Sequence, residues 1–195
     1  MKLRTLRAAL VLGGLVSAPA ALSAGPTAEM LSYPCAGCHG TDGSSVGPSS
    51  PSIAGIDPVY FIDNMLAYKK GERTSTIMTR IAKGYTDGQI EQMAGFFAAQ
   101  KLVRYPQKAD TAKASNGKEL HEKYCEKCHE DGGRNAEDSA VLAGQWMPYL
   151  HEAMNEFLTD GRTRPKKMKR KVDEMLQKHG KGAIDDLVNY YGSQQ

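Results

Sequence analysis

Two copies of a five-residue motif, Cys-x-x-Cys-His, use all four cysteines of this 195-residue sequence. The motif residues are Cys35, Cys38 and His39 in the first copy and Cys125, Cys128 and His129 in the second, 90 positions later. This pattern is typical of covalent attachment of c-type haem. Its two thiols can reach the two vinyl groups of one porphyrin, and the adjacent histidine can offer its imidazole to the iron. The motifs therefore predict two covalently bound haem c groups.

Paired cysteines have other uses, which fit this sequence less well. A zinc site uses the same Cys-x-x-Cys spacing. A thioredoxin-like redox pair requires a βαβ context, and the sequence gives no sign of one. Chance placement of two such motifs is rare at ordinary cysteine and histidine frequencies.

A second axial ligand for each iron is predicted from the methionines. Met78 lies 39 residues after His39, and Met168 lies 39 residues after His129. Methionine opposite histidine is common where electron transfer is the task, and it raises the reduction potential. Met65, Met154 and Met93 are better explained as core residues, whereas Met175, His151 and His179 remain alternatives in the second half. An iron with two protein ligands favours electron transfer over peroxidase or oxygenase chemistry.

The residues around each histidine suggest how its ring is held. Pro48 follows His39 by nine residues, and a backbone carbonyl beside it is predicted to accept a hydrogen bond from the His39 ring. An ordinary turn at Gly47-Pro48 explains the proline equally well. The second half has no proline between His129 and Leu142, so the two haem environments are expected to differ.

Further matches continue after the motifs and indicate a duplicated domain. The segment 53–55 recurs as 142–144, and 93–97 recurs as 187–191. We predict domains at 25–103 and 116–195, joined by a linker at 104–115. Apolar residues recur at helical spacing and no stretch alternates as a strand does, so the fold class is predicted to be all-α.

Capping residues mark where the helices are expected to begin and end. Asp57-Pro58 is predicted to open a helix that ends at Gly71, and Asp87 to open a second. The remaining predicted starts are Asp185 or Asp186 for the last helix, Ser115 or Asn116 before the second motif, and Thr27 before the first.

The first residues resemble a secretory signal peptide. Lys2, Arg4 and Arg7 precede the short apolar stretch 8–16, and small residues follow to Ala24. Cleavage of residues 1–24 would remove three of the 25 basic residues and leave 22 against 22 acidic ones. The near-neutral remainder gives no support to nucleic-acid binding. We expect a periplasmic protein without stable membrane insertion after cleavage.

A basic segment surrounds the second candidate methionine. Residues 162–171 contain seven basic side chains and no acidic one. The simpler interpretation is a solvated loop and helix start. The functional interpretation is a positive rim near the second haem that steers an acidic redox partner.

Several longer strings carry a family resemblance. They are 25–31, 35–51, 75–78 with 80–85, 120–121 with 123–129, and 142–146 with 148–150. Each half resembles a small His/Met cytochrome c of the class I type, and the whole chain is similar to the dihaem cytochrome subunit of flavocytochrome c sulfide dehydrogenases. The resemblance implies two tandem class I-type domains. It also implies that Cys35, Cys38, His39 and Met78 hold one haem, and Cys125, Cys128, His129 and Met168 the other.

The same resemblance implies a heterodimer with a larger flavoprotein that oxidises sulfide at a covalent FAD. Electrons would pass from that FAD through the two haems to a soluble cytochrome c acceptor, so the chain would not be catalytic alone. No Gly-x-Gly-x-x-Gly follows a strand pattern here, and any FAD is therefore expected only on the partner subunit.

Two other functions remain open. The first is a free-standing dihaem electron carrier to a terminal oxidase, and the second is a haem enzyme acting directly on a sulfur compound. A stable complex should bury apolar or aromatic groups such as Trp146, Tyr149 or Tyr60. If these side chains are wholly internal to the haem domains, the carrier hypothesis gains.

Overall fold

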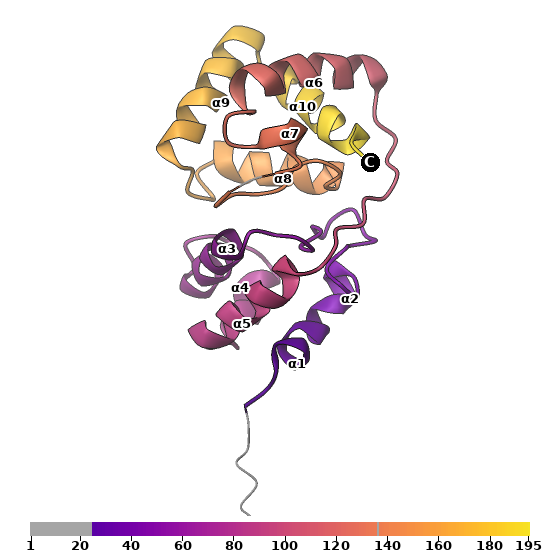
Figure 1. The fold of residues 1–195 in the computed structure, drawn as a ribbon. Coiled ribbons are helices and arrows are strands. Elements are labelled where there is room, and N and C mark those ends of the chain that lie inside the picture. Colours follow the sequence, from indigo (N-terminus) through magenta and orange to yellow (C-terminus); the bar gives the residue numbers. More distant parts are fainter. Residues whose placement is uncertain (1–24, 136) are drawn as a thin grey trace, which may run out of the picture.

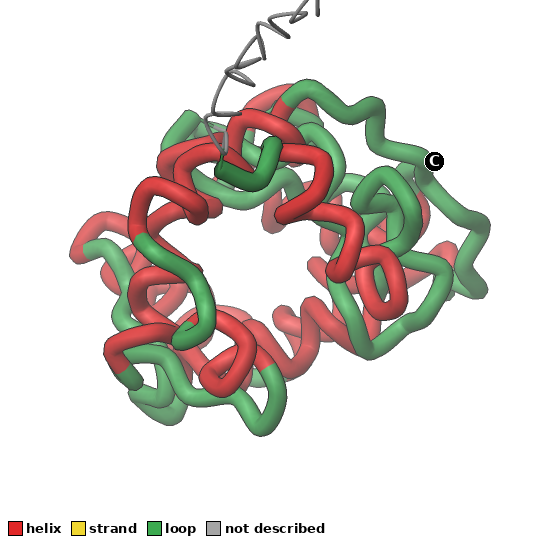
Figure 2. Tube along the Cα trace, turned by 90° about the horizontal axis from the view of Figure 1, so that it is seen from below, coloured by secondary structure: helices red, strands yellow, loops and turns green. Residues whose placement is uncertain are grey.

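The computed structural model describes residues 25–135 and 137–195, so the predicted signal peptide lies outside the described residues. Helices and connecting loops make up the described chain, with no strand in these ranges, as Figure 2 shows. The all-α prediction is confirmed. The first-half elements are α1 (Ala28–Ser32), the short 3₁₀ helix η1 (Tyr33–Cys35), α2 (Ala36–His39), α3 (Pro58–Lys70), α4 (Met78–Ala82) and α5 (Asp87–Ala98). The second-half elements are α6 (Thr111–Tyr124), α7 (Glu130–Gly133), α8 (Met147–Leu158), α9 (Lys166–His179) and α10 (Gly182–Ser193).

These helices form two groups, one below the other in Figure 1, each around its own apolar cluster. The first cluster is built mainly from α3 and α5, with Phe61, Met65, Ile90 and Phe97 in it. In the second group, α10 packs closely along α6. A Cβ on Gly117 would collide with the backbone of Asp186, so this close helix contact requires glycine.

Several predicted helix starts are confirmed. The Asp57 carboxylate accepts a hydrogen bond from the Tyr60 N–H at 2.9 Å, and Gly71 ends α3 with φ +78°. The Thr27 hydroxyl accepts from the Met30 N–H at 3.3 Å at the start of α1. Helix α5 begins at Asp87, as predicted.

Two predicted starts are wrong. Helix α6 begins at Thr111, capped by the Asp110 carboxylate, so Ser115 and Asn116 lie inside it and the last five residues of the predicted linker are helical. The sequence does not distinguish Asp110 from Ser115 or Asn116 as the capping residue, because Asp, Ser and Asn are nearly equivalent as N-caps. Helix α10 begins at Gly182, before Asp185 and Asp186.

The loop after each motif is closed by the same hydrogen bonds in both halves. The Gly43 carbonyl accepts from the N–H groups of Ile53 and Ala54 at 2.6 and 3.0 Å. The Gly133 carbonyl accepts from Leu142 and Ala143 at 2.8 and 2.9 Å. Both glycines have positive φ, +85° and +88°, which favours glycine at these turns. The duplication seen in sequence is thus also a duplication of backbone geometry.

The two halves meet along α3 and α8, which face each other in Figure 1. Arg73, 4% exposed, follows α3 and pairs with Glu156 of α8, with Nη2 and Oε2 2.8 Å apart. Arg162, 8% exposed, follows α8 and donates to the Tyr60 hydroxyl and to Asn64 Oδ1 at 2.6 and 2.8 Å. The two arginines occupy matching places in the repeat, so each half contributes one buried cation to the contact.

A second set of contacts joins the halves near the motif loops. The Gln145 side chain exchanges two hydrogen bonds of 2.9 Å with the Ser52 backbone. The Trp146 Nε1–H donates to the Ser45 carbonyl at 2.9 Å, and the indole stacks on Tyr105.

In the part of the chain that the structure describes, no helix is long and apolar enough to cross a membrane.

Removing the charge of Glu156, which pairs with the buried Arg73, should weaken the contact between the halves. We expect Glu156→Gln to lower the free energy of unfolding by about 1–3 kcal/mol, because Arg73 keeps a buried charge without its counter-ion. Urea unfolding of the haem-loaded protein measures this change. The control Glu122→Gln removes an exposed carboxylate 3.8 Å from Lys118 and should change stability by less than about 0.5 kcal/mol. Equal effects of the two substitutions would contradict the prediction.

Candidate functional site

Each Cys-x-x-Cys-His motif forms a compact turn beside its apolar cluster. Cys35 ends η1 and packs against the first cluster, whereas Cys38 in α2 is exposed. Cys125 follows the last residue of α6 and packs against the second cluster, and Cys128 is exposed. All four are free thiols. In each motif one thiol thus packs on the apolar cluster and the other is exposed, and the two would hold a porphyrin through its vinyl groups.

The pKa values of Cys35 and Cys125, the thiols that pack on the clusters, argue against a thiol redox pair. Burial raises the pKa of the Cys35 thiol, and burial raises the pKa of Cys125 to about 11. Reactive cysteine pairs instead lower the thiol pKa to obtain a thiolate. The raised thiol pKa at both motifs therefore argues against redox exchange.

A backbone carbonyl fixes the ring of each motif histidine. His39 Nδ1 lies 2.8 Å from the Pro51 carbonyl oxygen, and His129 Nδ1 lies 3.0 Å from the Ala140 carbonyl oxygen. The carbonyl predicted beside Pro48 is therefore the wrong one, since the loop closed on Gly43 presents Pro51 instead. Both rings share this carbonyl contact, because a backbone carbonyl needs no particular side chain. The predicted difference between the two environments lies beside it, since the Ser139 hydroxyl is 3.4 Å from His129 Nδ1.

Both imidazoles are prepared for metal binding. Burial lowers the pKa of His39 and of His129, which favours the neutral rings. With Nδ1 donating to a carbonyl, Nε2 keeps its lone pair, and this is the tautomer that can ligate iron. Two thiols and a neutral imidazole in each motif form a donor set that fits haem c.

The candidate methionines lie at equivalent places. Met78 begins α4, is half-buried against the first cluster, and its N–H donates to the Ser75 hydroxyl at 3.1 Å. Met168 is the third residue of α9 and half-buried. At i+4 and i+7 from it, Val172 and Met175 point into the second core. Met168 thus lies on the inward face of its helix.

The alternative ligands have other partners. Met175 is 1% exposed within the second apolar cluster, and Met65 and Met93 are buried in the first. His151 lies 3.3 Å from an Asp185 carboxylate oxygen, and His179 Nε2 lies 3.2 Å from the Tyr124 hydroxyl. The assignment of Met78 and Met168 stays a prediction.

Sequence reasoning missed a buried polar network in the second motif. His121 is fully buried between Glu126, which sits inside the motif, and the Tyr191 hydroxyl, 2.9 Å from His121 Nδ1. Burial alone would raise the pKa of the Glu126 carboxyl, but hydrogen bonds from His121 and from two backbone N–H groups lower it. The network ties α6, the motif turn and α10 together. Comparison of the two repeats could have revealed it, because His121 and Glu126 occupy the places of Leu31 and Ala36 in the first half.

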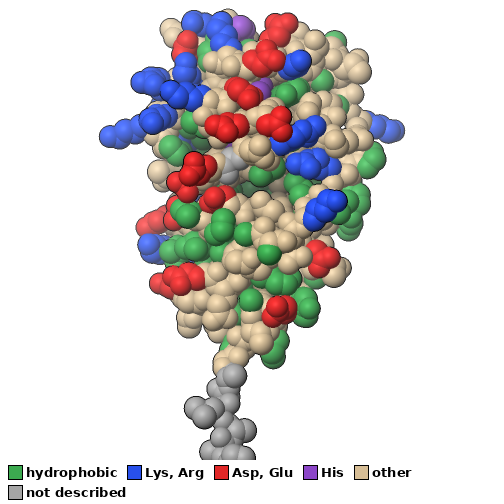
Figure 3. All heavy atoms as spheres, viewed as in Figure 1, with side chains coloured by type: hydrophobic (Ala, Val, Ile, Leu, Met, Phe, Trp, Pro, Cys, Tyr) green, Lys and Arg blue, Asp and Glu red, His purple; other side chains and the backbone are tan. Residues whose placement is uncertain are grey.

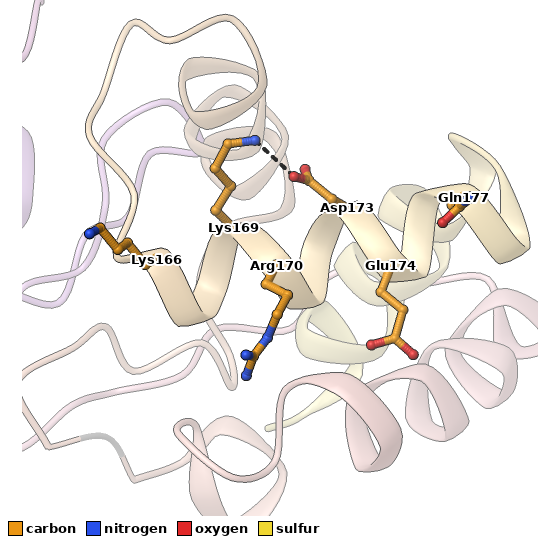
Figure 4. Close-up of a pocket in the computed structure, with 6 residues that line it drawn as sticks. All are labelled: Lys166, Lys169, Arg170, Asp173, Glu174 and Gln177. Carbon is orange, nitrogen blue, oxygen red and sulfur yellow. Dashed lines mark hydrogen bonds and ion pairs between the residues drawn. The ribbon is translucent and has the colours of Figure 1, made fainter.

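The surface differs between the halves. Figure 3 shows Lys and Arg side chains gathered over α9 at the upper left, whereas the lower half shows mainly apolar and acidic side chains. Figure 4 shows the residues along α9 that line a shallow hollow, with Lys169 turned to Asp173 and Arg170 pointing the other way.

The aromatic groups expected to face a partner are only partly exposed. Trp146 and Tyr60 make their hydrogen bonds across the contact between the two halves, and Tyr149 is partly buried. Large apolar groups are exposed elsewhere on the first half, among them Met30, Tyr33, Val46 and Ile77.

Comparison with known proteins agrees with this geometry. Residues 112–190 match the family described as cytochrome C oxidase, cbb3-type, subunit III. The cytochrome subunit of sulfide dehydrogenase from Chlorobaculum tepidum is 51% identical over 69 residues, which are 35% of this chain and 62% of that protein. Cytochrome c4 from Pseudomonas aeruginosa is 29% identical over 79% of each chain. The thiosulfate dehydrogenase electron acceptor of Thiomonas intermedia is 30% identical over 82% of this chain and 77% of that one.

The fold is also found among solved structures. Reduced recombinant cytochrome c4 from Pseudomonas stutzeri superposes with a TM-score of 0.74, at 24% identity, over 86% of this chain and 97% of that one. The fold, the two motifs and these relatives define a dihaem c-type cytochrome, an electron-transfer protein with two covalent haem c groups. Within that class, the chain belongs to the dihaem cytochrome c4-like family.

Each motif should carry its haem independently of the other. We expect Cys35→Ser/Cys38→Ser to reduce the intact mass by one haem while the second motif stays loaded, because each inner thiol packs against its own apolar cluster. Intact-mass spectrometry and haem absorbance per chain measure the content. The matched variant Cys125→Ser/Cys128→Ser should lose the other haem. Loss of both haems from either variant would show that loading is coupled.

Proposed function

We propose that this chain is the dihaem electron-transfer subunit of a periplasmic flavocytochrome c sulfide dehydrogenase. In this role it accepts electrons from the FAD of a partner flavoprotein that oxidises sulfide and passes them to a soluble cytochrome c. The observation that carries the proposal is the 51% identity over 69 residues to the cytochrome subunit of a sulfide dehydrogenase. The signal-like segment 1–24 supports the periplasmic location.

The proposed axial ligands are His39 with Met78 and His129 with Met168. Each bound haem supplies a one-electron ferrous/ferric couple. The chain's part is to hold the histidine rings through the Pro51 and Ala140 carbonyls, and to bury the porphyrin against the two apolar clusters. Methionine sulfur opposite imidazole stabilises ferrous iron and raises the potential.

Two haems on one chain suit a flavin donor. A flavin reduced by sulfide holds two electrons and a haem iron accepts one, so a pair of haems can empty the flavin. The exposed apolar groups of the first half, Met30 at 64%, Tyr33 at 58% and Ile77 at 56%, provide surface that a stable partner would cover.

A second candidate is a dihaem electron carrier that meets its partners only transiently. Trp146 and Tyr60 are partly buried in the contact between the halves, which leaves less of them for a stable partner and supports this candidate. So does the 30% identity over most of the chain to the electron acceptor of a thiosulfate dehydrogenase. The two candidates use the same haems and ligands and differ only in the surfaces that partners cover.

Purification from the source periplasm, followed by haem absorbance, tests the assignment. We expect the haem peak to contain a larger chain with covalent flavin, and we expect its haems to be reduced on addition of sulfide. A chain that elutes alone and is reduced by another dehydrogenase but not by sulfide would establish the carrier.

Ligation by the two methionines has a spectroscopic test. Met168→Ala should remove half of the long-wavelength absorption of methionine-ligated ferric haem and lower one of the two reduction potentials, because sulfur ligation favours ferrous iron. Met78→Ala should do the same to the other haem. The control Met175→Leu keeps an apolar side chain in the core and should leave the band unchanged. A band lost in Met175→Leu and kept in Met168→Ala would reassign the ligand.

A further inference from the structure

The surfaces around the two haem motifs differ at matching positions of the repeat. Four positions surrounding the first motif and its methionine are uncharged, and all four are lysine in the second half. The pairs are Tyr33 and Lys123, Gly37 and Lys127, Ile77 and Lys167, and Ile81 and Lys171. Two inward pairs keep their character: Ala82 and Val172 are both buried, and Cys35 and Cys125 both pack on their clusters. These four replacements are changes of surface charge, separate from the buried replacement of Leu31 by His121.

We name these four lysines, with Lys166 and Arg170, the basic face. The Tyr124 ring connects the lysines of α6 with those of α9. Lys123 Nζ lies 5.4 Å and Lys171 Nζ 5.8 Å from the centre of this ring. Tyr124 directly precedes Cys125. The basic face thus borders the attachment point of the second haem.

Folding stability does not account for these cations. Lys166, Lys167 and Lys169 occupy the first turn of α9, which has no acidic residue, and the positive end of the helix dipole disfavours cations there. Lys169 and Lys171 have carboxylate partners on α9. Among the described residues, Lys166, Lys167 and Arg170 have no ion pair, and Lys166 and Arg170 extend away from the helix in Figure 4.

We infer that the basic face docks an acidic soluble redox protein, which exchanges electrons with the second haem. The inference rests on the proposed electron-transfer function and adds a surface and a partner chemistry to it. Opposite charge on the partner accelerates encounter and orients it, and such contacts are transient and sensitive to salt. Of the six matching positions in the first half only Arg80, at the place of Arg170, is charged, and Tyr33, Ile77 and Ile81 are exposed by 58%, 56% and 40%. That surface therefore offers a weaker attraction.

The test is stopped-flow oxidation of the reduced dihaem protein by acidic plastocyanin, in which one ferrous haem becomes ferric as one cupric ion becomes cuprous. We expect the wild-type rate constant to fall steeply between about 10 mM and about 200 mM salt. The variant Lys123→Gln/Lys127→Gln/Lys167→Gln should be at least about tenfold slower at low salt and should lose most of the salt dependence.

Three variants and a second oxidant make the result specific. Lys70→Gln/Lys101→Gln/Lys108→Gln removes the same charge from exposed sites elsewhere and should change the rate less than about twofold. Lys123→Arg/Lys127→Arg/Lys167→Arg keeps the charge and should keep the rate. Cationic tris(bipyridine)cobalt(III), a small one-electron oxidant, should oxidise the glutamine variant of the basic face no more slowly than the wild type.

The outcomes separate this inference from the proposed function. A plastocyanin rate that is equal in the two glutamine variants, or independent of salt in the wild type, overturns docking on the basic face while electron transfer to the cobalt complex continues. A reduced protein that neither oxidant can oxidise overturns the electron-transfer function itself.

Discussion

The hydrogen bond between a histidine Nδ1 and a backbone carbonyl is the constraint around which each half is built. It fixes the ring plane and the tautomer, and so decides where Nε2 points. The bond forms only if the loop after the motif returns its carbonyl to the ring. Gly43 and Gly133 turn that loop through positive φ, and their carbonyls are held by the residues that follow Pro51 and Ala140. The loop, the glycine and the imidazole form one unit.

The last helix of each half anchors that unit. The Gly55 N–H donates to the Phe97 carbonyl, and the Gly144 N–H donates to the Tyr191 carbonyl, both at 2.8 Å. Because Phe97 and Tyr191 are also core residues, the same helix positions define the apolar cluster and the return of the loop. A half of about 80 residues buries little apolar surface by itself. The covalent porphyrin adds apolar mass where the inner thiol meets the cluster, so cofactor and core stabilise each other.

Much of this arrangement was predictable, and the reasons for the rest are physical. The motifs, the duplication and the helical class follow from residue types at fixed spacing, and the caps at Asp57 and Thr27 follow from side-chain chemistry. The carbonyl partner of His39 did not follow, because every residue has a carbonyl and only the folded loop selects Pro51. The start of α6 was misjudged because Asp110, Ser115 and Asn116 are all good N-caps, and only packing against α10 decides among them.

Contacts between the halves were the least predictable part. Arg73 and Arg162 occupy matching positions in the repeat, yet neither has an acidic neighbour at helical spacing that would mark it as buried. Their burial depends on Glu156, Tyr60 and Asn64 arriving from the other half. The pairing of Gln145 with the Ser52 backbone has the same origin. Sequence periodicity describes one helix at a time, so it cannot reveal a contact that exists only when two domains meet.

The two halves show how the copies of a duplicated domain can come to present different surfaces to their partners. Buried positions are constrained by packing in both copies, and most keep an apolar side chain, as with Ala82 and Val172, although His121 replaces Leu31. Exposed positions carry no such constraint, and there the copies have separated into an apolar surface and a basic one. An electron carrier with two equal surfaces would exchange electrons with any partner at either haem. Dissimilar surfaces let a persistent apolar contact and a brief electrostatic one coexist on one chain, so that donor and acceptor do not compete for the same haem.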